Sequence, residues 1–398
     1  MKYVVVLPDG VADVPIAALG NKTPLEAAKH PNMDWIAANG VTGWAHTIPQ
    51  GFPPGSDVGC MSVFGYDPKK YYTGRAPLEA AAQGIALGDG DVAFRCNTVT
   101  ITDGVMTDYS AGHIESADSH ELIKTVNERL GSKHGVRFYP GVSYRHLMVI
   151  HGAEYGKTQC VPAHDLSDKP VMPPKGMGAE KLGQILCEAA GILKDHPVNQ
   201  RRIAAGKRPA NQLWFWGQGT VAKFPLFQKE YGLKGACISA VDIVRGLGTL
   251  VGFDIIKVPG ITGYFDTNYK GKAEYALKAL ENHDFVLVHV EPTDEAGHMG
   301  DAQKKIQAIE DTDRLVVGTL LEGLKKRGEP YAIMIVCDHP TSTALKTHIA
   351  EPVPFAMYPT KSTHERVTTY NETAVNAATT RIQDGYRLMS VFLSQGKP

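Results

Sequence analysis

The stretch DFVLVHVEPTDEAGH, residues 284–298, decides the predicted fold, because a continuous apolar run ends directly in an acidic segment that also carries a histidine. Two other parts of the chain have the same form. MKYVVVLPDG begins the sequence and closes with Asp9, and YAIMIVCDH, residues 331–339, closes with Asp338 and His339. Unalternating runs rich in β-branched residues are typical of strands buried on both faces, as in a parallel sheet covered by helices. The sequence therefore predicts an α/β fold with carboxylates at the ends of its strands.

Apolar runs and helix-like stretches alternate along most of the chain. The runs predict strands at residues 3–7, 212–216, 235–241, 254–258, 285–290, 331–336 and 354–358. The helix-like stretches carry apolar residues at helical spacing, and they lie at residues 240–252, 271–283 and 301–328. This alternation predicts a mostly parallel sheet flanked by helices.

The segment from residue 91 to residue 170 has a different pattern. Short alternating stretches such as VAFRCNTVTI surround one predicted helix, ADSHELIKTVNERL. We therefore predict a smaller α+β domain, residues 91–170, inserted into an α/β core made of residues 1–90 and 171–398. The proline- and glycine-rich stretch 167–178 is interpreted as the linker that returns to the core.

The composition favours a cytoplasmic enzyme that acts on a small molecule. The 41 Lys and Arg residues nearly balance the 42 Asp and Glu residues, so the sequence lacks the basic excess of proteins that bind nucleic acid or an anionic membrane. The six cysteines form no CxxC pair, which is typical of a reduced cytosolic protein. The first apolar run is too short for a signal peptide, and no later run could span a bilayer. The oligomeric state stays open.

The strand-end acids predict a metal site, because ligands of open α/β sheets bind beyond the carboxyl ends of the strands. Aspartate and imidazole without cysteine suit Mn²⁺, Mg²⁺, Zn²⁺ or Fe²⁺. Taken singly, an aspartate could instead cap a helix, and a histidine could make an ordinary polar contact. Six candidates are too many for one catalytic ion with an open position. We therefore predict two divalent ions at a site made of Asp9, Asp294, His298, Asp338, His339 and His348.

A fourth element, GFPPGSDVGCMSVFGYDP, carries a candidate nucleophile. Its prolines and Gly55 predict a turn, after which a helix could begin at Ser56. Unpaired N–H groups and the helix dipole favour anions at that position. A serine hydroxyl needs a base or a metal to become a good nucleophile, and two metal ions could both activate it and neutralise a phosphoryl group. We therefore predict phosphoryl transfer at Ser56, with a plain helix cap as the alternative.

Together, PDG at the start, PPGSD followed by GYDP, then EPTDEAGH, and CDH with TSTALKTHIAEPVPF resemble the archaeal-type cofactor-independent phosphoglycerate mutases of the alkaline phosphatase superfamily. The resemblance runs along nearly the whole chain. It implies an alkaline-phosphatase-like α/β fold, and it implies Ser56 as a nucleophile that is transiently phosphorylated and contacts a metal ion. It also implies that one ion binds Asp9, Asp338 and His339, and that the other binds Asp294, His298 and His348.

The resemblance further implies a reaction and a cofactor set. Mn²⁺ is the expected ion, with Mg²⁺ or Zn²⁺ as alternatives, and no nucleotide is required. In this interpretation 3-phosphoglycerate gives its phosphoryl group to Ser56, and the group returns to the 2-hydroxyl without 2,3-bisphosphoglycerate. The inserted domain is expected to be a cap that closes over the substrate.

The cap must supply cations for phosphate and carboxylate, together with a group that carries the hydroxyl proton. Guanidinium groups fit such anions in a bidentate manner. The predicted substrate-binding residues are Arg75, Arg95, His113, Arg145 and His146. Asp108 is the predicted catalytic proton carrier, and His113, in the same TDYSAGHI segment, is a second candidate for that role.

Three other functions stay open from the sequence. Archaeal members of the family read closer to DRSAGRI where this chain has DYSAGHI, and this departure favours a homoserine kinase-like phosphotransferase. A kinase needs a nucleotide site, but GAEYGKT, residues 152–158, has one residue too few for a phosphate-binding loop and is interpreted as a turn. A phosphomonoester or sulfate hydrolase would use the same metal core. A non-catalytic metal-binding protein would explain the acids and histidines but not Ser56.

Overall fold

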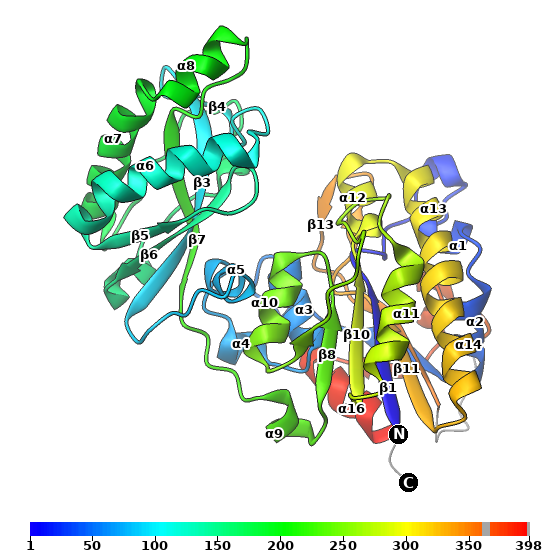
Figure 1. The fold of residues 1–398 in the computed structure, drawn as a ribbon. Helices are drawn as coiled ribbons and strands as arrows, with labels where there is room; N and C mark the ends of the chain where they lie inside the picture. The colour runs from blue at the N-terminus through cyan, green and yellow to red at the C-terminus, as the bar shows by residue number, and fades with distance from the viewer. Residues whose placement is uncertain (360–366, 396–398) are drawn as a thin grey trace. The chain divides into compact units, whose positions relative to one another are not determined.

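The computed structural model of the protein describes residues 1–359 and 367–395. The chain forms two compact units (Figure 1). Unit 1 consists of residues 1–72 and 223–398, and unit 2 consists of residues 73–222. None of the helices in the described residues has both the length and the apolar character that a membrane crossing needs.

Unit 1 is built on an eight-stranded sheet with the strand order β15-β2-β14-β11-β1-β10-β8-β9. The strands from β11 to β9 in this order run parallel to one another, whereas β14 is antiparallel to both β11 and β2. The central strands are buried almost throughout, as their apolar runs predict. The bounds are β1 (Lys2–Pro8), β2 (Val41–Ala45), β8 (Gly235–Ile238), β9 (Asp254–Ile255), β10 (Phe285–Val290), β11 (Tyr331–Val336), β14 (Val353–Tyr358) and β15 (Thr380–Ile382).

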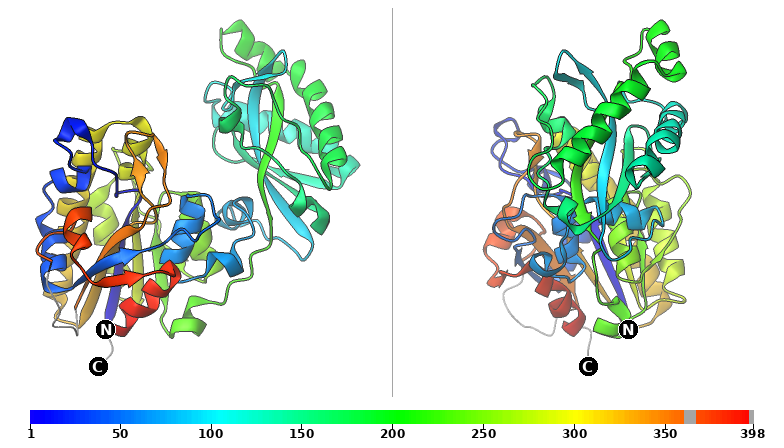
Figure 2. Two further views of the ribbon diagram at one scale, coloured as in Figure 1. Left: turned by 180° about the vertical axis from the view of Figure 1, so that it is seen from behind. Right: turned by 90° about the vertical axis from the view of Figure 1, so that its left-hand side faces the viewer.

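Helices cover both faces of this sheet, and the right-hand view of Figure 2 shows strand β1 in dark blue between the red C-terminal helix and the yellow helices. One group consists of α2 (Pro31–Asn39), α11 (Tyr269–Ala279), α13 (Ala302–Asp311), η4 (Thr312–Val317) and α14 (Gly318–Arg327). A second group consists of α3 (Ser56–Val63), α10 (Asp242–Leu250) and α16 (Leu388–Gln395). The single helix predicted at residues 301–328 is α13, η4 and α14 in succession, with π-helical turns in η4.

Shorter elements complete unit 1. In Figure 1, α12 and β13 lie at the same end of the sheet, where β10 ends. The short helices are η1 (Ala17–Leu19), α1 (Pro24–Ala27), α4 (Pro68–Tyr71), α9 (Phe227–Tyr231), α12 (Pro292–Met299), α15 (Glu372–Asn376) and η5 (Gly385–Arg387). Strands β12 (Thr341–Ser342) and β13 (Thr347–His348) form a separate antiparallel pair.

Unit 2 has an antiparallel five-stranded sheet in which the long strand β3 pairs with β4, β6 and β7, and β5 pairs with β6. The largest apolar core of the unit lies between one face of this sheet and α6 and α7, and Figure 2 shows helices gathered along one side of these strands. The opposite face carries two smaller apolar clusters, one with α5 and one with η3. The bounds are α5 (Ala76–Ala82), β3 (Asp91–Thr102), β4 (Val105–Asp108), α6 (Ser116–His134), β5 (Val136–Tyr139), β6 (Arg145–His151), η2 (Ala153–Lys157), η3 (Ala163–Leu166), α7 (Ala179–Lys194), α8 (Pro197–Ala204) and β7 (Gln212–Thr220).

The predicted fold class, a mostly parallel α/β sheet with a smaller inserted α+β unit, is confirmed. Three details differ. Residues 212–216 are not a strand of the core, because they belong to β7, which pairs antiparallel with β3. Residues 354–358 lie in the core sheet but run antiparallel. The stretch 167–178 is not the return linker, because it bonds back within unit 2, for example from the Val171 N–H to the Gly104 carbonyl.

Unit 2 therefore begins earlier and ends later than the predicted domain of residues 91–170. It gains α5 at its start and α7, α8 and β7 at its end. An apolar run such as QLWFW indicates that a strand is buried but not which strand it pairs with, so the sequence could not place this boundary.

Candidate metal centre

Three neighbouring parallel strands, β11, β1 and β10, bring their terminal acids to one edge of the sheet. Asp9 follows β1, Asp338 lies two residues after β11, and Asp294 lies in the first turn of α12, which begins after β10. All three side chains are buried. The predicted convergence of these acids is confirmed, and their role as ligands remains a prediction.

The first cluster contains Asp9, Asp338 and His339, whose ligand atoms lie within 4.8 Å of one another. Nε2 of His339 is 3.1 Å from Oδ2 of Asp338 and 3.7 Å from Oδ1 of Asp9. Ser56 is the first residue of α3, and its Oγ lies 3.2 Å from the same Nε2. The predicted nucleophile therefore stands at a helix N-terminus beside the first cluster.

The second cluster contains Asp294, His298 and His348. Oδ2 of Asp294 lies 3.3 Å from Nε2 of His298, and Oδ1 lies 3.3 Å from Nε2 of His348. The two Nε2 atoms are 2.8 Å apart. The rings of His339 and His348 pack with their centroids 4.0 Å apart, so the two clusters are adjacent.

Two glycines allow the backbone to approach these acids closely. Gly10 has φ +57, and a Cβ at this position would lie 2.7 Å from Oδ1 of Asp294. A Cβ on Gly59 in α3 would lie 2.9 Å from Cβ of Asp338. Contacts this short do not occur between real side chains, so both positions need glycine. The backbone N–H of Gly10 also donates to Oδ1 of Asp338 at 3.2 Å.

Residues that the sequence did not single out hold the acids in place. Nε2 of His289 lies 2.7 Å from Oδ2 of Asp9, and its Nδ1 lies 3.0 Å from Oγ of Ser239. Thr341 donates from Oγ1 to Asp294. Metal-binding side chains commonly have such outer partners, which fix their orientation. The sequence signal for His289 was a histidine inside the apolar run FVLVHV. A histidine in a buried strand, however, is usually an ordinary core residue.

The pKa values show how strongly the carboxylates interact. Burial, followed by the charges of Asp338 and Glu291, raises the pKa of Asp9 well above its ordinary value. Burial opposes ionisation of Asp338 too, but the neighbouring His339 lowers the pKa of Asp338 to about 2. Asp294 likewise has a pKa well below its ordinary range, because its hydrogen bonds with His298 and His348 outweigh burial. The site therefore concentrates buried negative charge.

The donor set fits divalent cations. Oδ1 of Asp9 and Oε2 of Glu291 are buried without a hydrogen-bond partner among the described residues, and buried carboxylate oxygens normally have one. Two imidazole Nε2 atoms and a carboxylate also converge in the second cluster. Oxygen and imidazole donors without thiolate suit Mn²⁺, Mg²⁺ or Zn²⁺. Asp9, His289 and Glu291 form a further group of the same kind.

Three of the predicted substrate-binding residues lie together on one face of the unit 2 sheet. Arg95 of β3 is buried, and its Nε donates to Oε2 of Glu79 at 3.0 Å. Arg75 donates from Nε to the other oxygen of Glu79 at 3.3 Å. Arg145 of β6 is exposed and packs over the ring of Tyr144. Arg75 was expected in the core, but it belongs to unit 2.

The predicted proton carriers Asp108 and His113 have different surroundings. Oδ1 of Asp108 accepts hydrogen bonds from the N–H and hydroxyl of Ser110, and its Oδ2 is 2.7 Å from Arg208. Although burial opposes ionisation, these bonds lower the pKa of Asp108. Such a carboxylate is poorly suited to carry a proton at neutral pH. His113 is exposed and packs against the ring of Tyr144.

His146 does not belong with the arginines. Pairing with Cys96 places its side chain on the sheet face that α6 and α7 cover, opposite to Arg95. The side chain is 1% exposed, and its Nδ1 accepts from the Gly141 N–H. Burial lowers the pKa of His146 to about 3. The structure does not bring His146 together with the predicted arginines, because adjacent side chains of a strand point to opposite faces.

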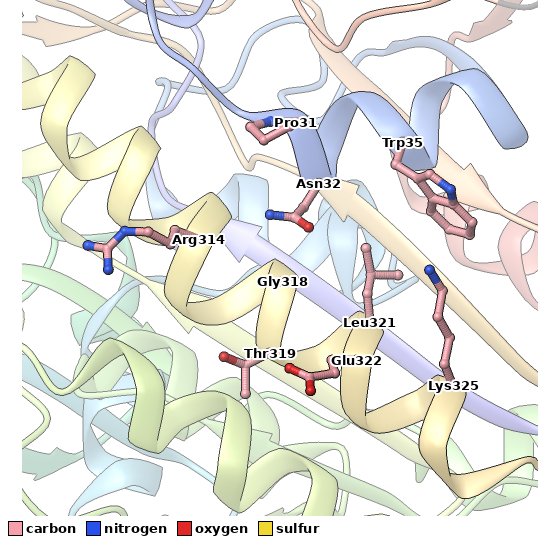
Figure 3. Close-up of a pocket in the computed structure, with 9 residues that line it drawn as sticks. All are labelled: Pro31, Asn32, Trp35, Arg314, Gly318, Thr319, Leu321, Glu322 and Lys325. Atoms are coloured by element: carbon pink, nitrogen blue, oxygen red, sulfur yellow. The ribbon is translucent and has the colours of Figure 1, made fainter.

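A pocket of about 560 Å³ lies elsewhere in unit 1, between α2 and the η4–α14 segment (Figure 3). Two of the residues that line it are in contact, with Nζ of Lys325 4.2 Å from the ring centroid of Trp35. None of the predicted site residues lines it. The lining residues are Pro31, Asn32, Trp35, Arg314, Gly318, Thr319, Leu321, Glu322 and Lys325.

Comparison with known proteins agrees with this geometry. A family model described as 2,3-bisphosphoglycerate-independent phosphoglycerate mutase matches residues 37–199, and one described as type I phosphodiesterase / nucleotide pyrophosphatase matches residues 192–386. A 2,3-bisphosphoglycerate-independent phosphoglycerate mutase of Methanosarcina acetivorans is 51% identical over 90% of this chain and 91% of the relative. The chain belongs to this mutase family.

Two further phosphoglycerate mutases extend the comparison over the full length. One from Methanothermobacter thermautotrophicus is 44% identical over 99% of this chain and 97% of its own. The solved structure of a cofactor-independent phosphoglycerate mutase from Thermoplasma acidophilum has a TM-score of 0.68 at 31% identity and is covered completely, as is this chain. The family predicted from PPGSD, EPTDEAGH and CDH is confirmed, and so is the mostly parallel α/β architecture of its core.

Proposed function

We propose that the chain interconverts 3-phosphoglycerate and 2-phosphoglycerate, with Ser56 as the residue that receives the phosphoryl group. The observation that carries this proposal is the position of Ser56 Oγ, at a helix N-terminus and 3.2 Å from Nε2 of His339. Helix N-termini favour anions, and membership of the mutase family supports the substrate. The enzyme is accordingly an isomerase that works without 2,3-bisphosphoglycerate.

The two clusters are proposed to bind two divalent ions. One would be held by Asp9, Ser56, Asp338 and His339, and the other by Asp294, His298 and His348. Bound ions would supply positive charge that neutralises the phosphoryl group and lowers the pKa of the serine hydroxyl. Mn²⁺ is our proposed ion, with Mg²⁺ or Zn²⁺ as alternatives, because all three accept oxygen and imidazole donors.

The chemistry at Ser56 consists of two transfers. In the first, Oγ of Ser56 loses its proton and bonds to phosphorus while the bond from phosphorus to O3 of the substrate breaks, and O3 takes up a proton. In the second, O2 of the glycerate loses its proton and bonds to phosphorus while the bond to Oγ breaks and Oγ is reprotonated. The enzyme returns to its starting state, and the substrate is isomerised.

Unit 2 is proposed to act as a cap that keeps water from the phosphorylated serine, because hydrolysis competes with the second transfer. Arg75, Arg95 and Arg145 would bind the substrate phosphate and carboxylate. His113 is our proposed proton carrier, since Asp108 is held as a hydrogen-bond acceptor. The cytoplasmic location and the absence of nucleic-acid and membrane partners stay predictions.

A coupled assay of the purified protein tests this function directly. We expect conversion of 3-phosphoglycerate to 2-phosphoglycerate with Mn²⁺ and without nucleotide, and no phosphorylation of homoserine in the presence of ATP. Release of inorganic phosphate at the rate of substrate consumption would indicate a hydrolase. Phosphorylation of homoserine without mutase turnover would replace the proposal by the kinase alternative.

A further inference from the structure

The second face of the unit 2 sheet has a polar patch between two apolar clusters. Ala93 and Leu147 pack with α5 at one end, and Val99 and Trp214 pack with η3 at the other. Side chains of alternate residues share a face, so Arg95 and Asn97 of β3 occupy the space between these clusters. Arg95 is 7% exposed and Asn97 is 2% exposed. A buried cation in the middle of a sheet requires partners.

Glu79 and Trp216 fix the orientation of Arg95. The Arg95 guanidinium lies over the indole of Trp216, 4.2 Å from the ring centroid, and Nε1 of Trp216 donates to Asn97 at 3.1 Å. Glu79, itself 7% exposed, accepts from Nε of Arg95 on one carboxylate oxygen and from Nε of Arg75 on the other. One carboxylate is therefore shared by two guanidinium groups.

The backbone beside this group departs from regular strand pairing. The register between β3 and β7 shifts between Ala93 and Arg95, and such bulges re-aim neighbouring side chains. Gly217, in the bulged part of β7, has φ +60. A Cβ at this position would lie 3.4 Å from Cδ of Arg95 and 3.6 Å from Cβ of Arg75. These are ordinary van der Waals distances, so the positive φ of Gly217, and not a lack of space, favours glycine at this position.

The terminal nitrogens of Arg95 are left for a ligand. Among the described residues no side chain or carbonyl accepts a hydrogen bond from its Nη1 or Nη2. The positive charges of Arg75 and Arg145 lie close enough to Arg95 to lower its pKa, while the charge of Glu79 raises it. Burial lowers the pKa of Arg95 only to about 10, with the charge of Glu79 opposing this decrease. Arg95 thus stays charged at neutral pH and can pair with an anion.

We propose that Glu79 is a positioning residue for the substrate, holding Arg75 and Arg95 by their Nε atoms so that the terminal nitrogens of Arg95 bind one oxyanion group. The end-on pair of terminal nitrogens matches the two oxygens of a phosphate or carboxylate. Glu79 itself does not touch the substrate. The identity of that substrate rests on the proposed function, whereas the oxyanion site does not.

Glu79→Gln tests the positioning role with little change in shape. The amide keeps one acceptor oxygen and turns a donor toward the other guanidinium, so one arginine loses its partner. We expect the Kd for inorganic phosphate to rise about tenfold, as for the loss of one charge-assisted hydrogen bond. Binding is followed in the metal-loaded protein by the tryptophan fluorescence change that Trp216→Phe abolishes, which confines the signal to this patch. A parallel titration with glycerate shows whether a carboxylate serves as well as a phosphate.

Glu121→Gln is the matched control, because Glu121 pairs with Arg201 at 3.0 Å on the exposed side of the same unit. It should leave phosphate binding unchanged. In turnover with 3-phosphoglycerate, Glu79→Gln should raise KM about tenfold with little change in kcat, the signature of lost uniform binding.

Wild-type phosphate affinity in Glu79→Gln would overturn the positioning role, as would a loss of kcat and thermal stability at unchanged KM. If the wild-type protein shows no mutase turnover, the proposed function fails, and the phosphate titration still decides the role of Glu79.

Discussion

The candidate metal centre of unit 1 and the arginine patch of unit 2, formed by Arg75, Arg95 and Arg145, concentrate charges of opposite sign. Unit 1 gathers buried carboxylates such as Asp9, Asp294 and Asp338 at the ends of parallel strands. Unit 2 gathers arginines on one face of an antiparallel sheet, where Glu79 pairs with Arg75 and Arg95. The first arrangement needs cations and the second needs an anion.

The two regions also differ in how their side chains are fixed. In unit 1, Asp9 and Asp338 follow the ends of strands and Asp294 lies in the first turn of α12, while Gly10 and Gly59 allow a close backbone approach to Asp294 and Asp338. In unit 2, Arg75 and Arg95 are held by the shared carboxylate of Glu79, next to the bulge between β3 and β7. Chemistry is therefore expected to depend on unit 1, and substrate affinity on unit 2. The following predictions separate these two dependences.

Ser56→Ala should have the largest effect, because it removes the atom that bonds to phosphorus. We expect kcat to fall by more than about a thousandfold, while phosphate binding at the arginine patch stays as in the wild type. Turnover and the Trp216 fluorescence titration measure the two effects. An active Ser56→Ala protein would exclude the phosphoserine mechanism.

His289→Gln should weaken metal binding without altering unit 2. His289 has its Nε2 2.7 Å from Asp9, and loss of such an outer partner commonly costs about 10- to 100-fold in metal affinity. Titration of metal-free protein with Mn²⁺ measures this directly. The exposed His151, 3.1 Å from Asp91 in unit 2, gives the control variant His151→Gln. Equal Mn²⁺ affinity in the two variants would show that His289 does not orient Asp9.

Gly10→Ala should disturb the metal centre more than a comparable change elsewhere. Gly10 and Gly20 both have positive φ, of +57 and +69, but a Cβ at Gly20 would meet nothing within 4 Å. Backbone strain alone costs about 1–2 kcal/mol, so Gly20→Ala should lose only that much in the free energy of unfolding. Gly10→Ala should lose about 1–3 kcal/mol more through overpacking. Denaturant unfolding measures both losses. Equal losses in Gly10→Ala and Gly20→Ala would contradict the close packing of Gly10 against Asp294.

Glu372→Gln should change the pH dependence of stability, with the smallest effect on function. Burial raises the pKa of Glu372 to about 7, from an ordinary value of 4.5. The folded protein therefore keeps a proton that the unfolded chain releases in this range, and the free energy of unfolding should fall as the pH rises from about 4.5 to about 7.

The glutamine variant should lack this decrease in the free energy of unfolding, which amounts to at most about 3 kcal/mol over the whole pH range. Thermal unfolding across the pH range measures it, with the exposed Glu281→Gln as control. An unchanged slope in Glu372→Gln would show that Glu372 ionises normally.

The sequence could predict that the acids of the candidate metal centre converge, because they follow apolar runs closely. Asp9 and Asp338 follow strands closely and Asp294 lies in the helix that begins after β10, so the parallel strands bring all three to one common edge. His289 was missed because a histidine within FVLVHV has no positional signal, and its contact with Asp9 joins residues 280 positions apart. Only the register of β1 and β10 brings them together.

The arginine patch could be predicted only in part. Arg75, Arg95 and Arg145 were singled out for their charge, but Glu79 lies in an alanine-rich helix and Trp216 in an apolar run assigned to the wrong sheet. His146 was included because it follows Arg145, although adjacent residues of a strand point to opposite faces. Strand pairing determines which side chains form such a patch, and it cannot be predicted from any single segment of the sequence.

The most direct test of the phosphoserine mechanism is to trap the phosphoryl group on the enzyme. Metal-loaded protein is mixed with 3-phosphoglycerate that is radiolabelled in its phosphoryl group, quenched within one turnover, and mapped by peptide. We expect label on the peptide that contains Ser56, and its disappearance when unlabelled glycerate is added before the quench. Turnover without label on the protein, or with label on another residue, would contradict the mechanism.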